Sequence, residues 1–319
     1  MSGPVASKAA RAPHWASMGE TSFVAGIWLL YAVHRLTGRW LFRVFMAPVV
    51  LVHWLGRPAL RAASLQYLRR LQAAQAPFAR EPGWREGLRH VGLFADTLLD
   101  KLLVTANRYP LERVQVRGTE GIDAAFAGGE GGVLVTAHLG CLELCRALGR
   151  QRHGMRINVL VHTRHAVAFN NVLRRLNPES QVQLIEVSEL GVPTAIMLAE
   201  KVAAGEFVAI AGDRVPVRQS QTVSVDFLGY PAPLPVGPYV LASLLKCPLY
   251  LLGCVHEGAG YAVHIECLAE RVELPRATRQ AALQAHAQTF ANALTRLLRR
   301  SPYDWFNFFP FWDQQSHAD

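Results

Sequence analysis

Apolar and polar positions follow two rhythms from about residue 115 onward. Short continuous apolar runs, such as "GVLVTA" at 132–137, are typical of strands buried on both faces of a sheet. Between them lie stretches with the period of an amphipathic helix. Strands are predicted at 132–137, 156–161, 182–187 and 206–212, and helices at 142–150, 168–176 and 193–205.

The same alternation continues toward the C-terminus. The stretch "TVSVDFLG" at 222–229 has the strict alternation of an edge strand. A helix is predicted at 237–246, a strand pair at 248–257 and 261–268, and a long amphipathic helix at about 276–300. This order of elements predicts an α/β fold with a mixed, largely parallel sheet flanked by helices.

The N-terminal region has a different pattern. Residues 1–20 are small and polar and are predicted to be a disordered lead. Two apolar runs without formal charge follow, at 21–33 and 44–56, and each is shorter than the ~18–20 residues that an upright helix needs to cross a bilayer. Between them lie His34, Arg35, Arg39 and Arg43. A charge at the bilayer centre costs about 3 kcal/mol, so a simple single span is not favoured.

Residues 21–60 are therefore interpreted as a membrane-anchoring helix or helical pair whose arginines reach the level of the lipid phosphates. Trp28, Trp40 and Trp54 suit the membrane interface. The alternative is a buried helical hairpin in a soluble protein. The remaining residues, 61–319, form the predicted α/β domain.

Composition also favours a membrane surface. Hydrophobic residues make up 51% of the chain and charged residues 18%, with a net charge of +9. A basic and apolar chain points to an anionic membrane more than to nucleic acid, and it carries no zinc-finger spacing or aromatic RNA-binding signature. Further basic residues follow the apolar segment: Arg57, Arg61, Arg69 and Arg70.

The cysteines do not indicate a disulfide framework. There are five, an odd number, which favours a reducing compartment. Cys141 and Cys145 form a C-x3-C spacing beside His138, but no second Cys/His pair accompanies it. Small buried thiols are therefore expected there rather than zinc, and no metal is implied.

Polar side chains follow three of the predicted strands. In open α/β sheets, ligands bind beyond the carboxyl ends of the strands. The three groups are His138 with Glu143, then His162, Arg164 and His165, then Asp213 and Arg214. Three strand ends of this kind point to a common site.

His138 and Glu143 have a specific geometric requirement. Residues five apart on a regular helix are about 140° out of phase, so the pair cannot meet if both are helical. They can meet if His138 ends the strand, Gly140 allows the turn, and Glu143 lies in the first helical turn. Glu143 would then fix the imidazole tautomer and leave the other ring nitrogen as a general base. The alternative is a core histidine beside a glutamate that interacts only with the helix dipole.

Several motifs together resemble a known family. They are "HLGCLELCRAL", "VHTRHAVAFNNVLRRLNP", "FVAIAGDRVP", "DFLGYPAPLPVGPYVLASLLKCP" and "WFNFFPFW". Their order, with H-x4-E at a strand-to-helix turn, resembles the lysophospholipid acyltransferase superfamily, and within it the late acyltransferases of lipid A biosynthesis. The resemblance covers residues 14–313. Glycerol-phosphate members have an E-G-T-R-like third motif, whereas this chain has "AGDR", which favours the lipid-A-like branch.

The resemblance implies roles for the residues at the strand ends. His138 would be the general base and Glu143 the carboxylate that orients it. Arg164 would contact an anionic acceptor or the acyl carrier. Asp213 and Arg214 would shape the pocket for donor and acceptor.

Two glycines complete the predicted site. Backbone amides at the helix start near Gly140 and Cys141, with Arg164 or Arg214, would stabilise the oxyanion. Gly237 belongs to the fourth motif, "FLGYPAPLPVGPYVLA", whose prolines and glycines suit an irregular wall of an acyl tunnel. The aromatic run at 305–312 is expected to be a hydrophobic plug over the acyl site or a second membrane contact; the alternative is core packing.

These observations predict a membrane-bound acyltransferase that moves a fatty acyl group from an acyl thioester to a lipid or glycolipid. The thioester, on acyl carrier protein or coenzyme A, is a co-substrate, and no other cofactor is implied. The expected location is the bacterial inner (cytoplasmic) membrane, with the catalytic domain facing the cytoplasm. The rival hypotheses are a non-catalytic lipid-binding membrane protein of the same fold and an acyl-thioester hydrolase.

Overall fold

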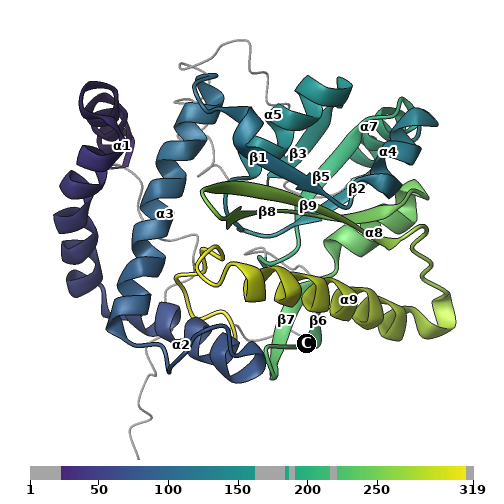
Figure 1. Cartoon of the computed structure of the whole chain (residues 1–319). Coiled ribbons are helices and arrows are strands. Elements are labelled where there is room, and N and C mark those ends of the chain that lie inside the picture. The colour runs from purple at the N-terminus through teal and green to yellow at the C-terminus, as the bar shows by residue number, and fades with distance from the viewer. Residues whose placement is uncertain (1–22, 162–183, 187–190, 216–220, 314–319) are drawn as a thin grey trace, which may run out of the picture.

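A mixed β-sheet forms the centre of the protein (Figure 1). The computed structural model describes residues 23–161, 184–186, 191–215 and 221–313. Seven strands pair in the order β1-β9-β8-β2-β5-β3-β4. They are β1 (Val114–Arg117), β2 (Gly132–Thr136), β3 (Ile157–Val161), β4 (Leu184–Glu186), β5 (Phe207–Ala211), β8 (Leu249–Glu257) and β9 (Gly260–Ala269). Only the β8–β9 pairing is antiparallel, so the predicted mixed, largely parallel sheet is confirmed.

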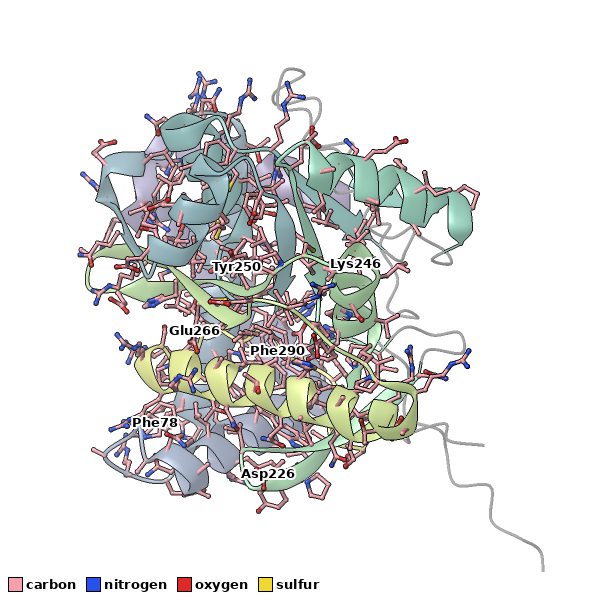
Figure 2. All side chains as sticks on the ribbon, turned by 90° about the vertical axis from the view of Figure 1, so that its right-hand side faces the viewer. Phe78, Asp226, Lys246, Tyr250, Glu266 and Phe290 are labelled. Carbon is pink, nitrogen blue, oxygen red and sulfur yellow. The ribbon has the colours of Figure 1, made fainter. Side chains whose placement is uncertain are left out.

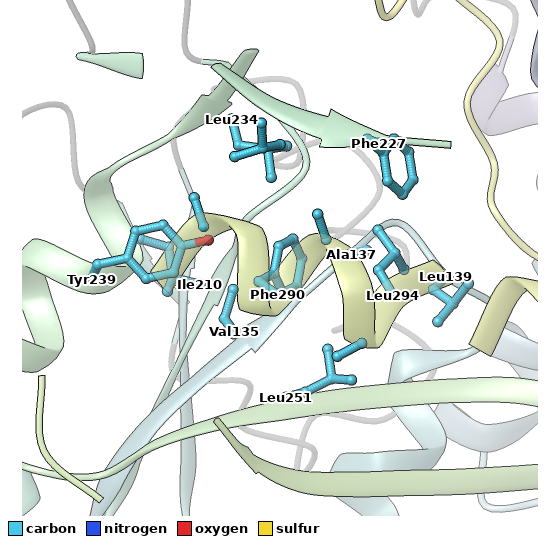
Figure 3. Close-up of a cluster of buried hydrophobic side chains, with 14 of the residues drawn as sticks. Val135, Ala137, Leu139, Ile210, Phe227, Leu234, Tyr239, Leu251, Phe290 and Leu294 are labelled. Carbon is cyan, nitrogen blue, oxygen red and sulfur yellow. The ribbon is translucent and has the colours of Figure 1, made fainter. Parts of the chain in front are cut away.

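Helices cover both faces of this sheet. On one face lie α4 (Glu120–Ala127) and α5 (Leu142–His153), and on the other lie α7 (Val192–Ala203), α8 (Gly237–Leu245) and α9 (Arg279–Arg300). Alternation along β2 explains both layers: Leu134 joins the core beneath α5, whereas Val135 joins the core beneath α9. Figure 3 shows Val135 on the same side of the sheet as Phe290 of α9.

Register in the centre of the sheet decides which strand ends meet. β2 pairs with β5, with Thr136 opposite Ala211, and on its other side β2 pairs with β8. β3 follows β2 in the chain but lies beyond β5. The residues that follow β2 and β5 therefore emerge side by side at the carboxyl edge of the sheet.

A separate hairpin replaces part of the expected irregular wall. β6 (Thr222–Phe227) pairs with β7 (Tyr230–Pro235) as an antiparallel two-stranded sheet. The predicted alternation at 222–229 is right, but β6 is not an edge of the central sheet. β7 contains three prolines at alternate positions, which a two-stranded sheet tolerates because no third strand needs their missing N–H groups. Figure 2 looks onto α9, which lies between the central sheet (Tyr250) and this hairpin (Asp226).

Three helices precede the sheet and share a core of their own. They are α1 (Phe23–Gly56), α2 (Pro58–Gln75) and α3 (Trp84–Thr105). α1 is kinked at Gly38, where φ is +76°. Beyond the kink, buried side chains recur every four residues and form one face of the helix: Phe42, Met46, Val50 and Trp54. This face belongs to the core that α1 shares with α3.

Two arginines of α1 do not extend toward lipid phosphates, which corrects part of the sequence interpretation. Arg39 donates to Asp100 of α3 at 2.6 Å, and Arg43 donates to Asp96 of α3 at 3.0 Å. Asp100 is fully buried and also accepts a hydrogen bond from the Tyr261 hydroxyl at 3.0 Å. The two charges are thus neutralised within the helix pair.

The other face of α1 is mostly apolar and is exposed. Leu36, Trp40 and Val52 are exposed to 86%, 74% and 70%. Further large exposed hydrophobic residues on the same helix are Val44, Phe45, Val49, Leu51 and Leu55. Within the described ranges, Tyr31–Gly56 is the one helix that is long and apolar enough to cross a membrane. A core helix would have buried this second face.

Candidate acyl-transfer site

His138 and Asp213 meet at the carboxyl edge of the sheet. Each lies two residues beyond the end of its strand, and the two strands are paired in register. The His138 Nδ1 atom lies 2.9 Å from Asp213 Oδ1, and the His138 backbone N–H donates to Oδ2 at 2.9 Å. A third donor, the indole N–H of Trp305, reaches Oδ2 at 2.9 Å. The carboxylate is thus fixed by three hydrogen bonds.

The protonation of this pair follows from the charge on Asp213. Burial would raise the pKa of its carboxyl group, but the charge and hydrogen bonds of His138, with the charge of Arg214, hold that pKa far below its usual range. An ionised carboxylate only accepts hydrogen bonds, so Nδ1 of His138 carries the proton and donates a hydrogen bond to Asp213. Arg214 Nε lies 3.2 Å from the same nitrogen, which then has no lone pair to offer. Arg214 therefore acts on the imidazole as a neighbouring charge.

The second ring nitrogen of His138 is left as the basic atom. The side chain is 48% accessible, in contrast to the buried Asp213 behind it. Burial among surrounding protein atoms and the positive charge of Arg214 lower the pKa of His138, while Asp213 opposes them. The imidazole is therefore neutral near pH 7, with Nε2 unprotonated. This is the state that a general base requires.

Glu143 does not hold His138, and this corrects the predicted pairing. It lies in the first turn of α5 as expected, but its carboxylate is 3.5 Å from Lys101 Nζ of α3, and the Cys141 thiol lies 3.8 Å from it. Burial alone would lower the pKa of Lys101, but Glu143 and Cys141 raise it on balance. The carboxylate that binds the Nδ1 position of His138 is Asp213.

The turn after His138 requires glycine at position 140. Gly140 has φ +53°, and a Cβ there would stand 1.9 Å from the carbonyl oxygen of Cys254. Its N–H donates to the backbone oxygen of Asp304 at 3.0 Å. This amide is therefore engaged, which corrects its expected part in an oxyanion hole.

The remaining predicted residues are placed as follows. Arg214 follows Asp213, its Nη2 atom donates to the Phe306 oxygen at 3.1 Å, and its guanidinium lies over the Phe309 ring at 4.4 Å. Gly237 begins α8, where a Cβ would stand 3.7 Å from Ile210 of β5. Arg164 lies outside the described residues, as do His162 and His165.

The aromatic segment 305–312 packs inside the protein. Trp305 and Phe311 are fully buried, and no residue of the segment is exposed. The core-packing alternative is therefore right, and a second membrane contact is not what these side chains make. The segment also touches the site, since the Phe306 N–H donates to the His138 oxygen at 2.9 Å. The aromatic run is evident in the sequence, but no pattern there identifies Asp304 and Lys101 as neighbours of the site or the Trp305 indole as a donor to Asp213.

Comparison with known proteins identifies the family of this chain. Residues 101–314 match the model of the bacterial lipid A biosynthesis acyltransferases. The chain belongs to that family. The matched range begins at Lys101 in α3 and contains the His138–Asp213 pair and the aromatic segment.

The chain is also similar to two curated proteins. Each is a phosphatidylinositol mannoside acyltransferase of Mycobacterium tuberculosis, one from strain H37Rv and one from strain CDC 1551. Each is 30% identical over 218 residues, which is 63% of this chain. The match spans 60% of the length of each relative. The superfamily resemblance found in the sequence is confirmed.

Replacing Gly140 with alanine is expected to disrupt the turn. The Cβ would collide with the Cys254 carbonyl in addition to the strain of a positive φ. Gly258→Ala is the matched control, because its φ is +60° but nothing lies within 4 Å of a Cβ there. Chemical denaturation should show Gly140→Ala to be less stable than the control by about 1–3 kcal/mol, the usual cost of overpacking. Equal stability of the two variants would contradict the clash.

Replacing Arg214 with glutamine should change the pH dependence of acyl transfer. Removing the positive charge favours protonation of His138 and so raises its pKa. Activity that needs the neutral imidazole is lost as the pH falls through that pKa. The acid limb of the kcat/KM profile should therefore move to higher pH than in the wild type. A limb that stays in place or moves to lower pH would exclude Arg214 as the charge that acts on His138.

Proposed function

We propose that this protein transfers a fatty acyl group from an acyl thioester to a hydroxyl group of a membrane lipid or glycolipid. Membership of the family supports acyl transfer, and the relatives' name, phosphatidylinositol mannoside acyltransferase, supports a glycolipid acceptor. The observation that carries the mechanism is the half-exposed His138 held at Nδ1 by the ionised Asp213. The donor is acyl carrier protein or coenzyme A.

The chemistry follows from the free Nε2 atom. Nε2 of His138 takes the proton of the acceptor hydroxyl as its oxygen attacks the thioester carbonyl carbon. The tetrahedral intermediate then collapses, the C–S bond breaks, and the imidazolium returns the proton to the leaving thiolate. The products are an acyl ester and a free thiol. Asp213 stabilises the imidazolium between the two steps.

Three features of the site suit the developing negative charge. Arg214 places a guanidinium beside His138, and Lys101 places an ammonium beside Glu143 at the start of α5. The Cys141 amide, just before the same helix, is the backbone donor that we assign to the oxyanion in place of Gly140. Glu143 then serves to fix Lys101 at the mouth of the site, and Arg164 is proposed to contact the anionic acceptor or carrier.

Substitution of His138 and Asp213, singly and together, tests this mechanism. His138→Ala removes the base, so acyl transfer should fall by roughly 10²–10⁴-fold. Asp213→Asn keeps the shape of the side chain but removes the negative charge beside Nδ1 of His138, so its activity should fall about as much as that of His138→Ala. The double variant should be little worse than His138→Ala, because the two residues act as a unit. Glu143→Gln should lose less than Asp213→Asn, since Glu143 contacts Lys101 rather than the imidazole.

The assay is transfer from a labelled acyl thioester to a total lipid extract, with circular dichroism as the folding control and mass spectrometry of the products. Folded His138→Ala protein with wild-type transfer would sink the mechanism. Release of free fatty acid without acylated lipid would favour the hydrolase instead. Lipid binding without turnover would favour a non-catalytic lipid-binding protein. Lipid profiles of cells with and without the protein would identify the acceptor.

The exposed face of α1 is proposed to hold the protein on the cytoplasmic side of the inner membrane. It offers large side chains to lipid, while Arg39 and Arg43 are already neutralised by acids of α3. An ion pair inside the helix pair lowers the cost of placing these charges near hydrocarbon. The net charge of +9 favours an anionic leaflet.

Polar substitution of this face should release the protein from membranes. The variant combines Leu36→Gln, Trp40→Gln and Val52→Gln, and full-length protein is mixed with anionic phospholipid vesicles and floated. Loss of three apolar side chains that would insert into lipid should weaken partitioning by at least about 100-fold.

The matched control for the flotation combines Tyr230→Gln, Ile196→Gln and Leu244→Gln, three exposed apolar or aromatic residues on β7, α7 and α8. This variant should float with the vesicles like the wild type. Flotation of both triple variants at the wild-type level would remove α1 as the anchor.

A further inference from the structure

The two carboxylate oxygens of Asp213 accept hydrogen bonds from different donors, and Trp305 is one of these donors. Its indole N–H and the backbone N–H of His138 both donate to Oδ2 at 2.9 Å. Oδ1 is thereby left for the imidazole of His138, at 2.9 Å. A carboxylate with one oxygen held from two directions has little freedom to rotate, so its other oxygen stays aligned with Nδ1.

The indole is itself rigidly held. Trp305 is fully buried, and its ring packs edge-on against Tyr67, Phe227 and Phe311 at centroid distances of 4.9, 5.3 and 4.9 Å. Its backbone oxygen lies 2.9 Å from His90 Nε2. Burial lowers the pKa of His90 to about 4, so the ring is neutral. Because a carbonyl oxygen only accepts hydrogen bonds, Nε2 carries the ring proton and donates to this oxygen.

The backbone around Trp305 is paired with the turn that carries His138. Leu139 and Trp305 form an antiparallel bridge. On either side of it, the Phe306 N–H donates to the His138 oxygen, and the Gly140 N–H donates to the Asp304 oxygen. The segment is thus held against the turn by a β-bridge and two flanking backbone hydrogen bonds.

Asp304 anchors the segment around Trp305 to the central sheet. Its carboxylate contacts His256 of β8 twice, at Nδ1 (2.7 Å) and at the backbone N–H (2.6 Å). The arrangement repeats that of His138 with Asp213, where one aspartate also holds the ring and the backbone N–H of one histidine. The indole is therefore positioned relative to β8, the neighbour of β2 in the sheet.

We propose that Trp305 is a positioning residue of the acyl-transfer site, whose indole N–H fixes the Asp213 carboxylate so that Oδ1 supports the imidazole of His138. This role rests on the proposed function. It extends the site from a pair of residues to a triad of His138, Asp213 and Trp305. The third member comes from the aromatic segment, and it acts through Asp213 rather than on the substrate.

The test removes the N–H and keeps the packing. Trp305→Phe deletes the donor, and benzothienylalanine at position 305 replaces the N–H by sulfur with almost the same ring shape, in case the phenylalanine variant does not fold. Trp312→Phe is the matched control, because the Trp312 indole belongs to the same aromatic cluster but donates to the Phe227 oxygen at 3.2 Å.

Two measurements separate positioning from packing. In acyl transfer, kcat should fall roughly 10- to 100-fold for both Trp305 variants, the usual effect of losing a hydrogen bond to a charged group, with KM unchanged. In a histidine-labelled NMR titration, the pKa of His138 should rise, because a carboxylate without the indole donor interacts more strongly with the imidazolium. Arg214 and Lys101, the other charges that act on His138, are unaltered in these variants. Trp312→Phe should show neither effect.

The outcomes distinguish this proposal from the proposed function. An unchanged His138 pKa in both Trp305 variants would overturn the positioning role, even if kcat fell. An unchanged kcat in both, with His138→Ala inactive, would overturn it as well and leave the acyltransferase mechanism standing. Wild-type transfer by His138→Ala would instead refute the mechanism, while the NMR titration would still report whether Trp305 acts on Asp213.

Discussion

A single buried carboxylate organises the centre of this protein. Removing an ionised carboxylate from water costs several kcal/mol unless hydrogen bonds compensate for the loss. Asp213 obtains that compensation from a backbone N–H, an imidazole and an indole, which belong to segments on either side of it in the sequence. The β2 turn, the β5 end and the aromatic segment together bring all three donors to it. The geometry that orients the imidazole of His138 is thus also what makes the charge at position 213 tolerable.

Much of this architecture is visible in the sequence because it depends on local pattern. The apolar runs identify the strands, and the polar residues after them identify both His138 and Asp213 as members of a common site. Their partnership is not visible, because it depends on β5 rather than β3 lying next to β2. Sequence proximity suggested Glu143, which is five residues from His138. The actual partner, Asp213, follows β5, and β3 and β4 lie between β2 and β5 in the chain.

The same limitation explains the arginines of α1. In the sequence, Arg39 and Arg43 interrupt an apolar segment, and this pattern predicts contact with lipid phosphates. Their partners, Asp100 and Asp96, lie on α3 at the same spacing of four residues, so that two successive turns of one helix match two of the other. Nothing in the local pattern of either helix announces the match. It arises only when the buried face of α1 is packed against α3.

The bridge between Leu139 and Trp305 has a consequence for how the protein is made. The ribosome synthesises the His138 turn long before it reaches the segment that pairs with it, and the contact between Trp305 and Asp213 spans 92 residues. Closing such loops is entropically costly and slow compared with forming local helices. A nascent chain can therefore form its helices and much of its sheet while the site stays incomplete. Full alignment of His138 comes only when the aromatic segment has been translated and folded back, so a partly synthesised chain has an unassembled site.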